Sequence, residues 1–181
     1  MAAGSVVRVE LLPNFSDFRP FDESAPTFAE NAAGKALHYS RHTQEIVLAD
    51  DSGLVVPVLG GAPGVHSARY AGPSATDADR CRKLLHEMEG REGGERRARF
   101  VCVIALAQGG KVLGILSDRA EGVLANEPRG SGGFGYDPIF FFPELDRTFA
   151  ELAPSEKNAY SHRGKAFRKA VKFLEKSFSQ L

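Results

Sequence analysis

The chain has 181 residues, 43% of them apolar and 25% charged, which is the balance of one globular domain with a sizeable core. Lysine plus arginine and aspartate plus glutamate both number 23, so the formal net charge is zero and the composition argues against a nucleic-acid binder. The longest apolar runs fall far short of the roughly 20 residues that span a bilayer, and no secretion signal is visible, so we expect a cytoplasmic protein that does not enter a membrane.

The cysteine content favours the same compartment. Cys81 and Cys102 are too few for a disulfide framework, and their spacing is not that of metal ligands. Free thiols are usual in a reducing cytoplasm.

The first quarter of the chain predicts a strand, a loop and a helix. Residues 6–12 form a short β-rich stretch, and residues 16–26 have the composition of a loop. Thr27 and Glu30 have the spacing of a capping box, in which a hydroxyl and a carboxylate each satisfy a free backbone amide. An alanine-rich helix should follow, over about residues 28–42.

The middle of the chain predicts alternating strands and helices. The expected elements are a buried strand at 46–49 that runs into Asp50 and Asp51, a loop at 59–73, a helix from Thr76 to about Glu89, a strand at 99–107, a hairpin turn at 108–111 and a returning strand from Val112. Strands interleaved with helices indicate an α/β fold.

The last third of the chain predicts a glycine-rich loop, a strand and a terminal helix. The loop covers 130–137, the apolar run covers 139–142, and the helix starts between Ser155 and Ser161. One face of that helix is apolar: Phe167, Ala170, Val171, Leu174, Phe178 and Leu181. The cations lie mostly on the other faces, and we interpret them as a solvated face rather than a binding patch: Lys165, Arg168, Lys169, Lys172 and Lys176.

Asp50 and Asp51 are candidates for metal chemistry. They stand at the expected carboxyl end of a buried strand, where ligands of α/β proteins collect. Two adjacent carboxylates are costly to ionise there unless a cation compensates, and Mg²⁺ takes oxygen ligands of this kind. Taken alone, the pair is equally compatible with a turn in which aspartate accepts backbone amides. Glu23 could add a second acidic ligand, although Asp22 and Glu23 by themselves are more typical of a solvated loop.

Two further segments carry side chains suited to a nucleotide. Phe134 and Asp137 combine a ring that can stack on a base with a carboxylate that can accept from a purine edge, although aromatic residues near a strand usually belong to the core. Lys157, His162 and Arg163 offer donors for phosphate or carbonyl oxygens near a helix start. Lys35 and the other cations would individually be surface residues by default.

Taken together, these segments resemble the inosine triphosphate pyrophosphatase family. Six blocks carry the resemblance in one order: TFAENA at 27–32 with Lys35, ADDSGL at 49–54, LGGAPGV at 59–65, SARYAG at 67–72, GGFGYDPIF at 132–140 and SHR at 161–163. The resemblance implies an α/β fold with a mixed sheet flanked by helices, two lobes around a substrate cleft, and a homodimer. It implies one nucleoside triphosphate pyrophosphatase domain over residues 1–181.

The resemblance also implies the roles of individual residues. Asp51 resembles the general base and a Mg²⁺ ligand, and Glu23 resembles the second metal-binding carboxylate. Ser52 and Lys35 resemble substrate contacts on the phosphate side. The base pocket of the family corresponds to Phe134, Gly135, Tyr136 and Asp137, with Phe134 stacking on the purine. The remaining substrate contacts correspond to Lys157, His162 and Arg163, with Arg163 facing the purine 6-oxo group.

The implied activity is hydrolysis of deaminated purine nucleoside triphosphates (ITP, dITP and XTP) to the monophosphate and pyrophosphate, which cleanses the nucleotide pool. One alternative is a non-catalytic purine nucleotide binder that kept the base pocket. Another is a related enzyme that clears other modified nucleotides, such as pyrimidine triphosphates, although the 134–137 segment argues against it.

The amino terminus departs from the family pattern. The family opens with a strand, a Thr/Ser-x-Asn-x-x-Lys loop and a helix, and such a loop binds phosphates through backbone amides and lysine charge. No such segment precedes Lys35, and Asn14 is the only amino-terminal candidate. We expect either a coding start placed too far downstream, which we favour, or a real loss of this segment, and in both cases reduced hydrolysis by these 181 residues.

Overall fold

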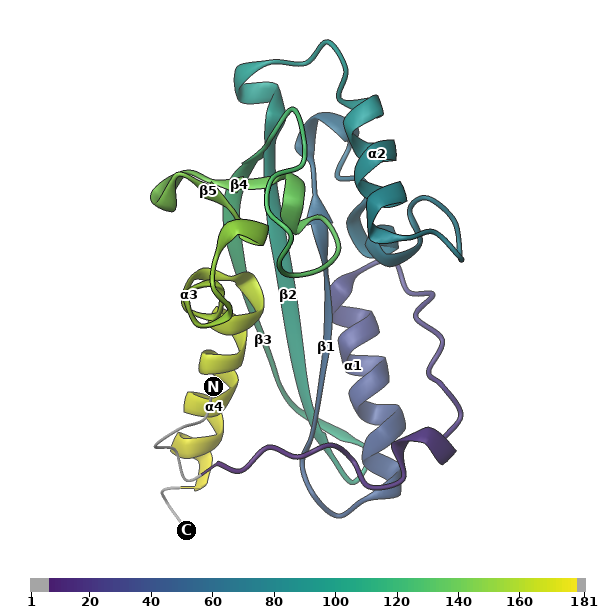
Figure 1. Cartoon of the computed structure of the whole chain (residues 1–181). Coiled ribbons are helices and arrows are strands. Elements are labelled where there is room, and N and C mark those ends of the chain that lie inside the picture. The colour runs from purple at the N-terminus through teal and green to yellow at the C-terminus, as the bar shows by residue number, and fades with distance from the viewer. Residues whose placement is uncertain (1–6, 179–181) are drawn as a thin grey trace. The chain divides into compact units, whose positions relative to one another are not determined.

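The computed structural model of the chain describes residues 7–178 and divides into two compact units (Figure 1). Unit 1 comprises Met1–Asp51, Cys102–Asp118 and Arg163–Leu181, and unit 2 comprises Ser52–Val101 and Arg119–His162. Three of the four boundaries fall inside long strands, so each unit contains part of the sheet, and the fourth follows His162.

Four α-helices flank a five-stranded sheet, so the α/β fold class expected from the sequence is confirmed. The helices are α1 (Phe28–Tyr39), α2 (Asp77–Glu87), α3 (Pro154–Tyr160) and α4 (His162–Phe178). The strands are β1 (Val47–Val55), β2 (Arg97–Gln108), β3 (Lys111–Leu124), β4 (Phe140–Phe142) and β5 (Arg147–Thr148), adjacent in that order. β4 pairs antiparallel with β3, Val123 opposite Phe141, and antiparallel with β5, Phe141 opposite Thr148. None of the helices within residues 7–178 combines the length and apolar character of a membrane span.

In unit 1, α1 begins where the sequence predicts. Thr27 is the N-cap, and its hydroxyl accepts the Glu30 backbone N–H at 3.2 Å. The Glu30 carboxylate accepts from the Thr27 hydroxyl at 2.7 Å and not from the Thr27 amide, so one half of the expected capping box is present. α1 ends at Tyr39, and a 3₁₀ turn continues to His42.

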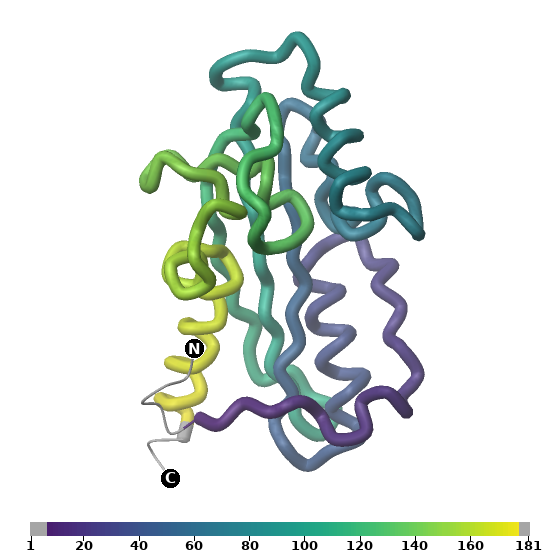
Figure 2. The backbone as a smooth tube through the Cα atoms, viewed as in Figure 1, coloured from purple at the N-terminus to yellow at the C-terminus, as the bar shows by residue number. Residues whose placement is uncertain are grey.

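The segment before α1 is not the strand that the sequence predicts. Residues 7–12 have no regular structure and lie mostly exposed, whereas Val6 falls outside the described residues. β-forming residues need a neighbouring strand to complete their hydrogen bonds, and local composition does not supply one. The following residues instead pack on the end of α1, with the Phe15 ring 5.0 Å from Tyr39 and the Phe18 ring stacked 4.3 Å from His42. Figure 2 shows this segment passing the end of α1 and running back along it.

The terminal helix is interrupted, which the sequence analysis did not anticipate. α3 ends at Tyr160, Ser161 is extended with φ −65° and ψ 152°, and α4 starts at His162. In unit 1, α4 packs its small residues Ala166 and Ala170 against Cys102 and Ile104. The predicted apolar face is confirmed for 167–174, where Phe167 is half-buried and the others are buried, whereas the side chains of Phe178 and Leu181 lie outside the described part.

Unit 2 has its own apolar core, which α2 covers. Leu84 of α2 and Met88, the C-cap residue of α2, join a cluster that contains Phe100, Phe140 and Phe149. The ring centres of Phe100 and Phe140 lie 4.6 Å apart. α2 starts where the sequence predicts, with a capping box between Thr76 and Asp79, and ends at Glu87 rather than at about Glu89.

In unit 1, the hairpin expected at 108–111 is confirmed between β2 and β3.

Candidate active site

Asp50 and Asp51 lie in the middle of β1, not at its carboxyl end as the apolar run at 46–49 predicts. β1 continues to Val55 because sheet pairing overrides the weak strand preference of aspartate and glycine. Consecutive strand side chains point to opposite faces, and their burial differs accordingly. Asp51 is 8% exposed, whereas the Asp50 side chain is 34% exposed.

Asp50 is paired with Arg163, the second residue of α4. The guanidinium Nε and Nη2 each lie 3.0 Å from Asp50 Oδ2. The Arg163 side chain is 39% exposed, so the pair is accessible to solvent. The sequence analysis assigned Arg163 to a purine carbonyl and did not connect it with Asp50.

Glu23 and Lys35 lie beside the same stretch of β1. Lys35 Nζ donates to the backbone oxygen of Asp50 at 2.9 Å and forms an ion pair with the Glu23 carboxylate. The Lys35 side chain is 22% exposed. This lysine therefore holds the Glu23 carboxylate next to the strand that carries Asp51.

Asp51 and Glu23 offer carboxylate oxygens, which are the type of ligand that Mg²⁺ takes. Among residues 7–178, no three His, Cys, Asp or Glu side chains gather into a metal-binding group. Mg²⁺ does not require such a cage, because it usually takes one or two carboxylates and completes its shell with waters and substrate phosphates. Asp51 and Glu23 would be the residues that hold the ion.

In unit 2, the glycines of the 130–137 loop are required by close packing. A Cβ at Gly133, where φ is +72°, would lie 2.1 Å from Asp137 Oδ2. A Cβ at Gly130 would lie 2.6 Å from the backbone of Ala150, and the Gly132 amide donates to the Ala150 oxygen at 3.0 Å. The glycines therefore let the loop fold tightly against its neighbours.

Asp137 anchors this loop. It is 2% exposed, and its Oδ2 accepts the Phe134 amide at 2.8 Å and forms an ion pair with Lys157. Burial raises the pKa of Asp137, and the Lys157 charge and the Phe134 amide oppose that rise.

Phe134 is the exposed aromatic residue of the loop. It is 58% exposed, and Lys157 Nζ lies 4.5 Å from the centre of its ring. An aromatic ring of this kind next to a cation offers a surface for stacking a base.

The other predicted substrate contacts of unit 2 are more buried than Phe134. Tyr136 is 2% exposed, its hydroxyl donates to the Ser67 oxygen at 3.0 Å, and burial raises its pKa. His162 is 6% exposed and stacks on Phe100, with ring centres 4.7 Å apart and planes 10° apart. Ser52, also in unit 2, is half-buried on β1.

Sequence analysis missed the residues that fix Gly135. Its amide donates to Asp77 Oδ2 at 2.6 Å, and its carbonyl accepts the Cys81 thiol at 3.3 Å. The capping box of α2 predicts where this helix begins, but no pattern in the sequence indicates which loop its first residues contact.

The Ham1 family matches residues 1–173 of the chain. The chain belongs to the Ham1 family. It is 51% identical over 163 residues to the dITP/XTP pyrophosphatase of Geobacillus kaustophilus. This match covers 90% of the chain and 80% of the Geobacillus protein. It is 53% identical over 150 residues to the dITP/XTP pyrophosphatase of Gloeobacter violaceus, covering 83% and 74%.

Solved structures of Ham1 proteins share the fold. The Coxiella burnetii HAM1 protein matches with a TM-score of 0.82 and 48% identity, over 87% of the chain and 81% of that structure. The Staphylococcus aureus Ham1 protein matches with a TM-score of 0.84 and 38% identity, over 90% and 84%.

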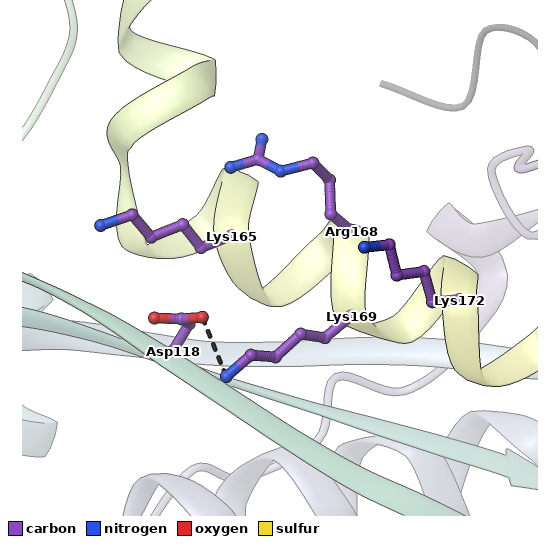
Figure 3. A pocket seen from close by; sticks show the side chains of 5 residues that line it. All are labelled: Asp118, Lys165, Arg168, Lys169 and Lys172. Carbon is purple, nitrogen blue, oxygen red and sulfur yellow. Dashed lines mark ion pairs between the residues drawn. The ribbon is translucent and has the colours of Figure 1, made fainter.

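This Ham1-family chain also has a basic hollow on α4 in unit 1 (Figure 3). The hollow is lined by Asp118, Lys165, Arg168, Lys169 and Lys172. Lys169 Nζ lies 2.9 Å from Asp118 and donates to the Ser117 oxygen at 2.8 Å, so one cation is neutralised within the hollow. Lys169 and Lys172 are exposed, which agrees with the prediction of a solvated face.

Proposed function

We propose that this Ham1-family chain hydrolyses the deaminated purine nucleoside triphosphates ITP, dITP and XTP to the monophosphate and pyrophosphate. The dITP/XTP pyrophosphatases of Geobacillus kaustophilus and Gloeobacter violaceus, at 51% and 53% identity, support the reaction and the substrate class. The observation that carries the proposal is the exposed Phe134 ring on a tightly anchored loop, because a water-exposed aromatic side chain held in place suits a planar base.

Base recognition is assigned to residues of unit 2. Phe134 stacks on the purine, and Gly135, Tyr136 and Asp137 shape and hold the loop that presents it. Lys157 contributes a positive charge beside the ring, at 4.5 Å. His162 is a further substrate contact.

Phosphate chemistry is assigned mainly to residues of unit 1. A water attacks the α-phosphorus, Asp51 takes the proton of that water, and the bond between the α-phosphorus and the bridging oxygen breaks, so that pyrophosphate leaves. Asp51 and Glu23 would hold Mg²⁺, and the bound ion would neutralise charge on the phosphate oxygens. Lys35, which contacts Glu23 and the Asp50 carbonyl, places a second positive charge at this end, and Ser52 contacts the phosphate side.

Selectivity follows from the direction of hydrogen bonds at purine position 6. Inosine and xanthine carry a carbonyl there, whereas adenine carries an amine. Arg163, oriented by Asp50, is the donor assigned to that carbonyl. A donor site that ATP leaves unpaired discriminates by a factor of about 10⁴.

The proposal extends to the cofactor, the assembly and the cellular location. The resemblance to inosine triphosphate pyrophosphatases favours Mg²⁺ as the cofactor, a homodimer as the assembly and the cytoplasm as the location. Zero net charge argues against nucleic acid as a partner.

Pyrophosphate release separates the candidate functions. The protein is incubated with ITP, dATP and dUTP plus Mg²⁺, with the Asp51→Asn variant as the inactive control. Release from ITP by the wild type alone supports the proposal. ITP binding without release would favour a non-catalytic nucleotide binder, and release mainly from dUTP would favour an enzyme for pyrimidine triphosphates.

A further inference from the structure

The backbone of Gly135 is held at both polar groups by helix α2, within unit 2. Its N–H donates to Asp77 Oδ2 at 2.6 Å, and its carbonyl oxygen accepts the Cys81 thiol at 3.3 Å. Asp77 and Cys81 are four residues apart and therefore lie on one face of the helix. Two side chains of one helix therefore form hydrogen bonds with the backbone of a single loop residue.

Asp77 is itself fixed in place. Its Oδ1 forms an ion pair with Arg80, and Arg80 Nη1 donates to the oxygens of Ala68 and Ala75 at 2.9 and 2.6 Å. The Gly135 amide is the main cause of a lowered pKa at Asp77, and Arg80 adds to it. The carboxylate is therefore ionised at neutral pH and strengthens its hydrogen bond to the loop.

Cys81 supports the same contact as a neutral donor. It is 4% exposed, and burial raises the pKa of its thiol to about 11. The sulfur therefore keeps its proton at neutral pH, and the S–H group can donate to the Gly135 oxygen.

The consequence falls on Phe134, the residue before Gly135. The Phe134 amide donates to Asp137 Oδ2 at 2.8 Å, so two consecutive backbone amides are bound by carboxylates. Because Phe134 is 58% exposed, core packing cannot define the place of its ring. The fixed backbone sets the direction in which the Phe134 side chain leaves the loop, and Lys157 lies beside its ring.

We propose that Asp77 is a positioning residue for the nucleobase: it holds the 134–135 backbone so that the Phe134 ring is ordered before the base arrives. This role rests on the proposed function of Phe134 as the stacking residue. A ring that is ordered in advance avoids the entropy cost of ordering on binding. Stacking contributes equally to the bound substrate and to the transition state, so its loss raises KM and leaves kcat nearly unchanged.

A fluorescence reporter tests the positioning without any need for catalysis. The chain contains no tryptophan, so a Phe134→Trp variant has one indole, at the position in question. Adding Asp77→Ala should lower the residual anisotropy of that indole. Asp79→Ala is the matched control, because Asp79 caps the same helix through Thr76 and has no contact with the loop in the described hydrogen bonds.

Steady-state kinetics on ITP test the consequence in the otherwise unmodified chain. Asp77→Ala should raise KM about tenfold with kcat within about twofold, at the low end of the loss expected for one base–aromatic stack. Asp77→Asn keeps an oxygen acceptor for the Gly135 amide and should recover most of the affinity. Asp79→Ala should leave KM unchanged. Thermal unfolding of each variant shows whether it folds. If Asp77→Ala does not fold, the KM values of Asp77→Asn and Asp79→Ala are compared instead.

The outcomes separate the two proposals. Unchanged anisotropy and unchanged KM in folded Asp77→Ala would overturn the positioning role, even if the wild type hydrolyses ITP. A fall in anisotropy in a protein that does not hydrolyse ITP would support the positioning of Phe134 and overturn the proposed function. An equal effect of Asp79→Ala would show that helix stability, and not the Gly135 contact, is responsible.

Discussion

Arg163 Nε and Nη2 both lie 3.0 Å from Asp50 Oδ2, although the two residues are 113 positions apart in the sequence. Asp50 immediately precedes Asp51, the proposed general base, and its own carbonyl oxygen accepts from Lys35. One residue thus contacts two of the proposed substrate-binding cations. Asp50 organises the group around Asp51, and its side chain is a partner for Arg163.

The Asp50→Asn variant should lose much of the orientation of Arg163. A partly exposed ion pair contributes up to about 1 kcal/mol, so kcat/KM for ITP should fall roughly two- to fivefold. Asp118→Asn is the matched control, because Asp118 pairs with Lys169 on the same helix α4. Equal kcat/KM values for the two variants would show that the Asp50 pair has no functional role.

Replacing Lys157 by methionine should destabilise the fold by breaking a buried ion pair. The side chains of Lys157 and Asp137 are 14% and 3% exposed, and removal of one partner of such a pair costs about 3–5 kcal/mol. Urea unfolding at pH 7.5 measures the loss. A double variant that also carries Asp137→Asn should recover most of the stability, and no recovery would indicate that lost packing, not the uncompensated charge, is the cause.

The same variant should regain stability in acid. Burial already raises the pKa of Asp137 in the folded protein, and loss of the Lys157 charge raises it further. The folded state of the variant therefore binds a proton more tightly than the unfolded state. Its stability relative to wild type should increase as the pH falls through that raised pKa. A difference from wild type that stays constant between pH 7.5 and pH 5 would contradict this assignment.

Gly122→Ala should be destabilising, because a Cβ at that position would lie 2.6 Å from both the Phe141 backbone oxygen and the tip of the Phe140 ring. Overpacking of this kind costs about 1–3 kcal/mol. Gly114→Ala offers a comparison within β3, since its nearest neighbour is the tip of the Phe173 side chain at 3.1 Å, which can move. Differential scanning calorimetry should show a clearly lower Tm for Gly122→Ala. A Tm of Gly114→Ala below that of Gly122→Ala would contradict this prediction.

Both cysteines should resist modification in the native protein. Cys81 and Cys102 are buried free thiols, and burial raises the pKa of Cys81 to about 11. At pH 8 only about one Cys81 in a thousand is then a thiolate, the reactive form. A thiol-specific chromogenic disulfide should therefore react slowly with folded protein and quickly after denaturation. Rapid reaction of one thiol per folded chain would contradict the burial.

Local sequence patterns predicted most elements of the fold. They failed where contacts with residues distant in the sequence determine the end of an element. The Thr76–Asp79 capping box and the turn at 108–111 are defined by neighbouring residues, and both are confirmed. The end of β1 was misplaced because sheet pairing continues past Asp51 to Val55. The break at Ser161 was missed because the helical pattern on either side is continuous.

The candidate site was predictable to a similar extent. The blocks of sequence identify which segments carry chemistry, but not which of their side chains touch. The contact of Gly135 with Asp77 spans 58 positions, and that of Asp50 with Arg163 spans 113. Neither contact has a periodicity or a spacing that one sequence could reveal.

Phosphorus NMR of the products formed from ITP and ATP under identical conditions with Mg²⁺ identifies both the bond that is cleaved and the preferred base. We expect pyrophosphate and no orthophosphate from ITP, with ATP hydrolysed several orders of magnitude more slowly and no product from either nucleotide with the Asp51→Asn variant. Orthophosphate as the first product, or equal rates with ITP and ATP, would contradict it.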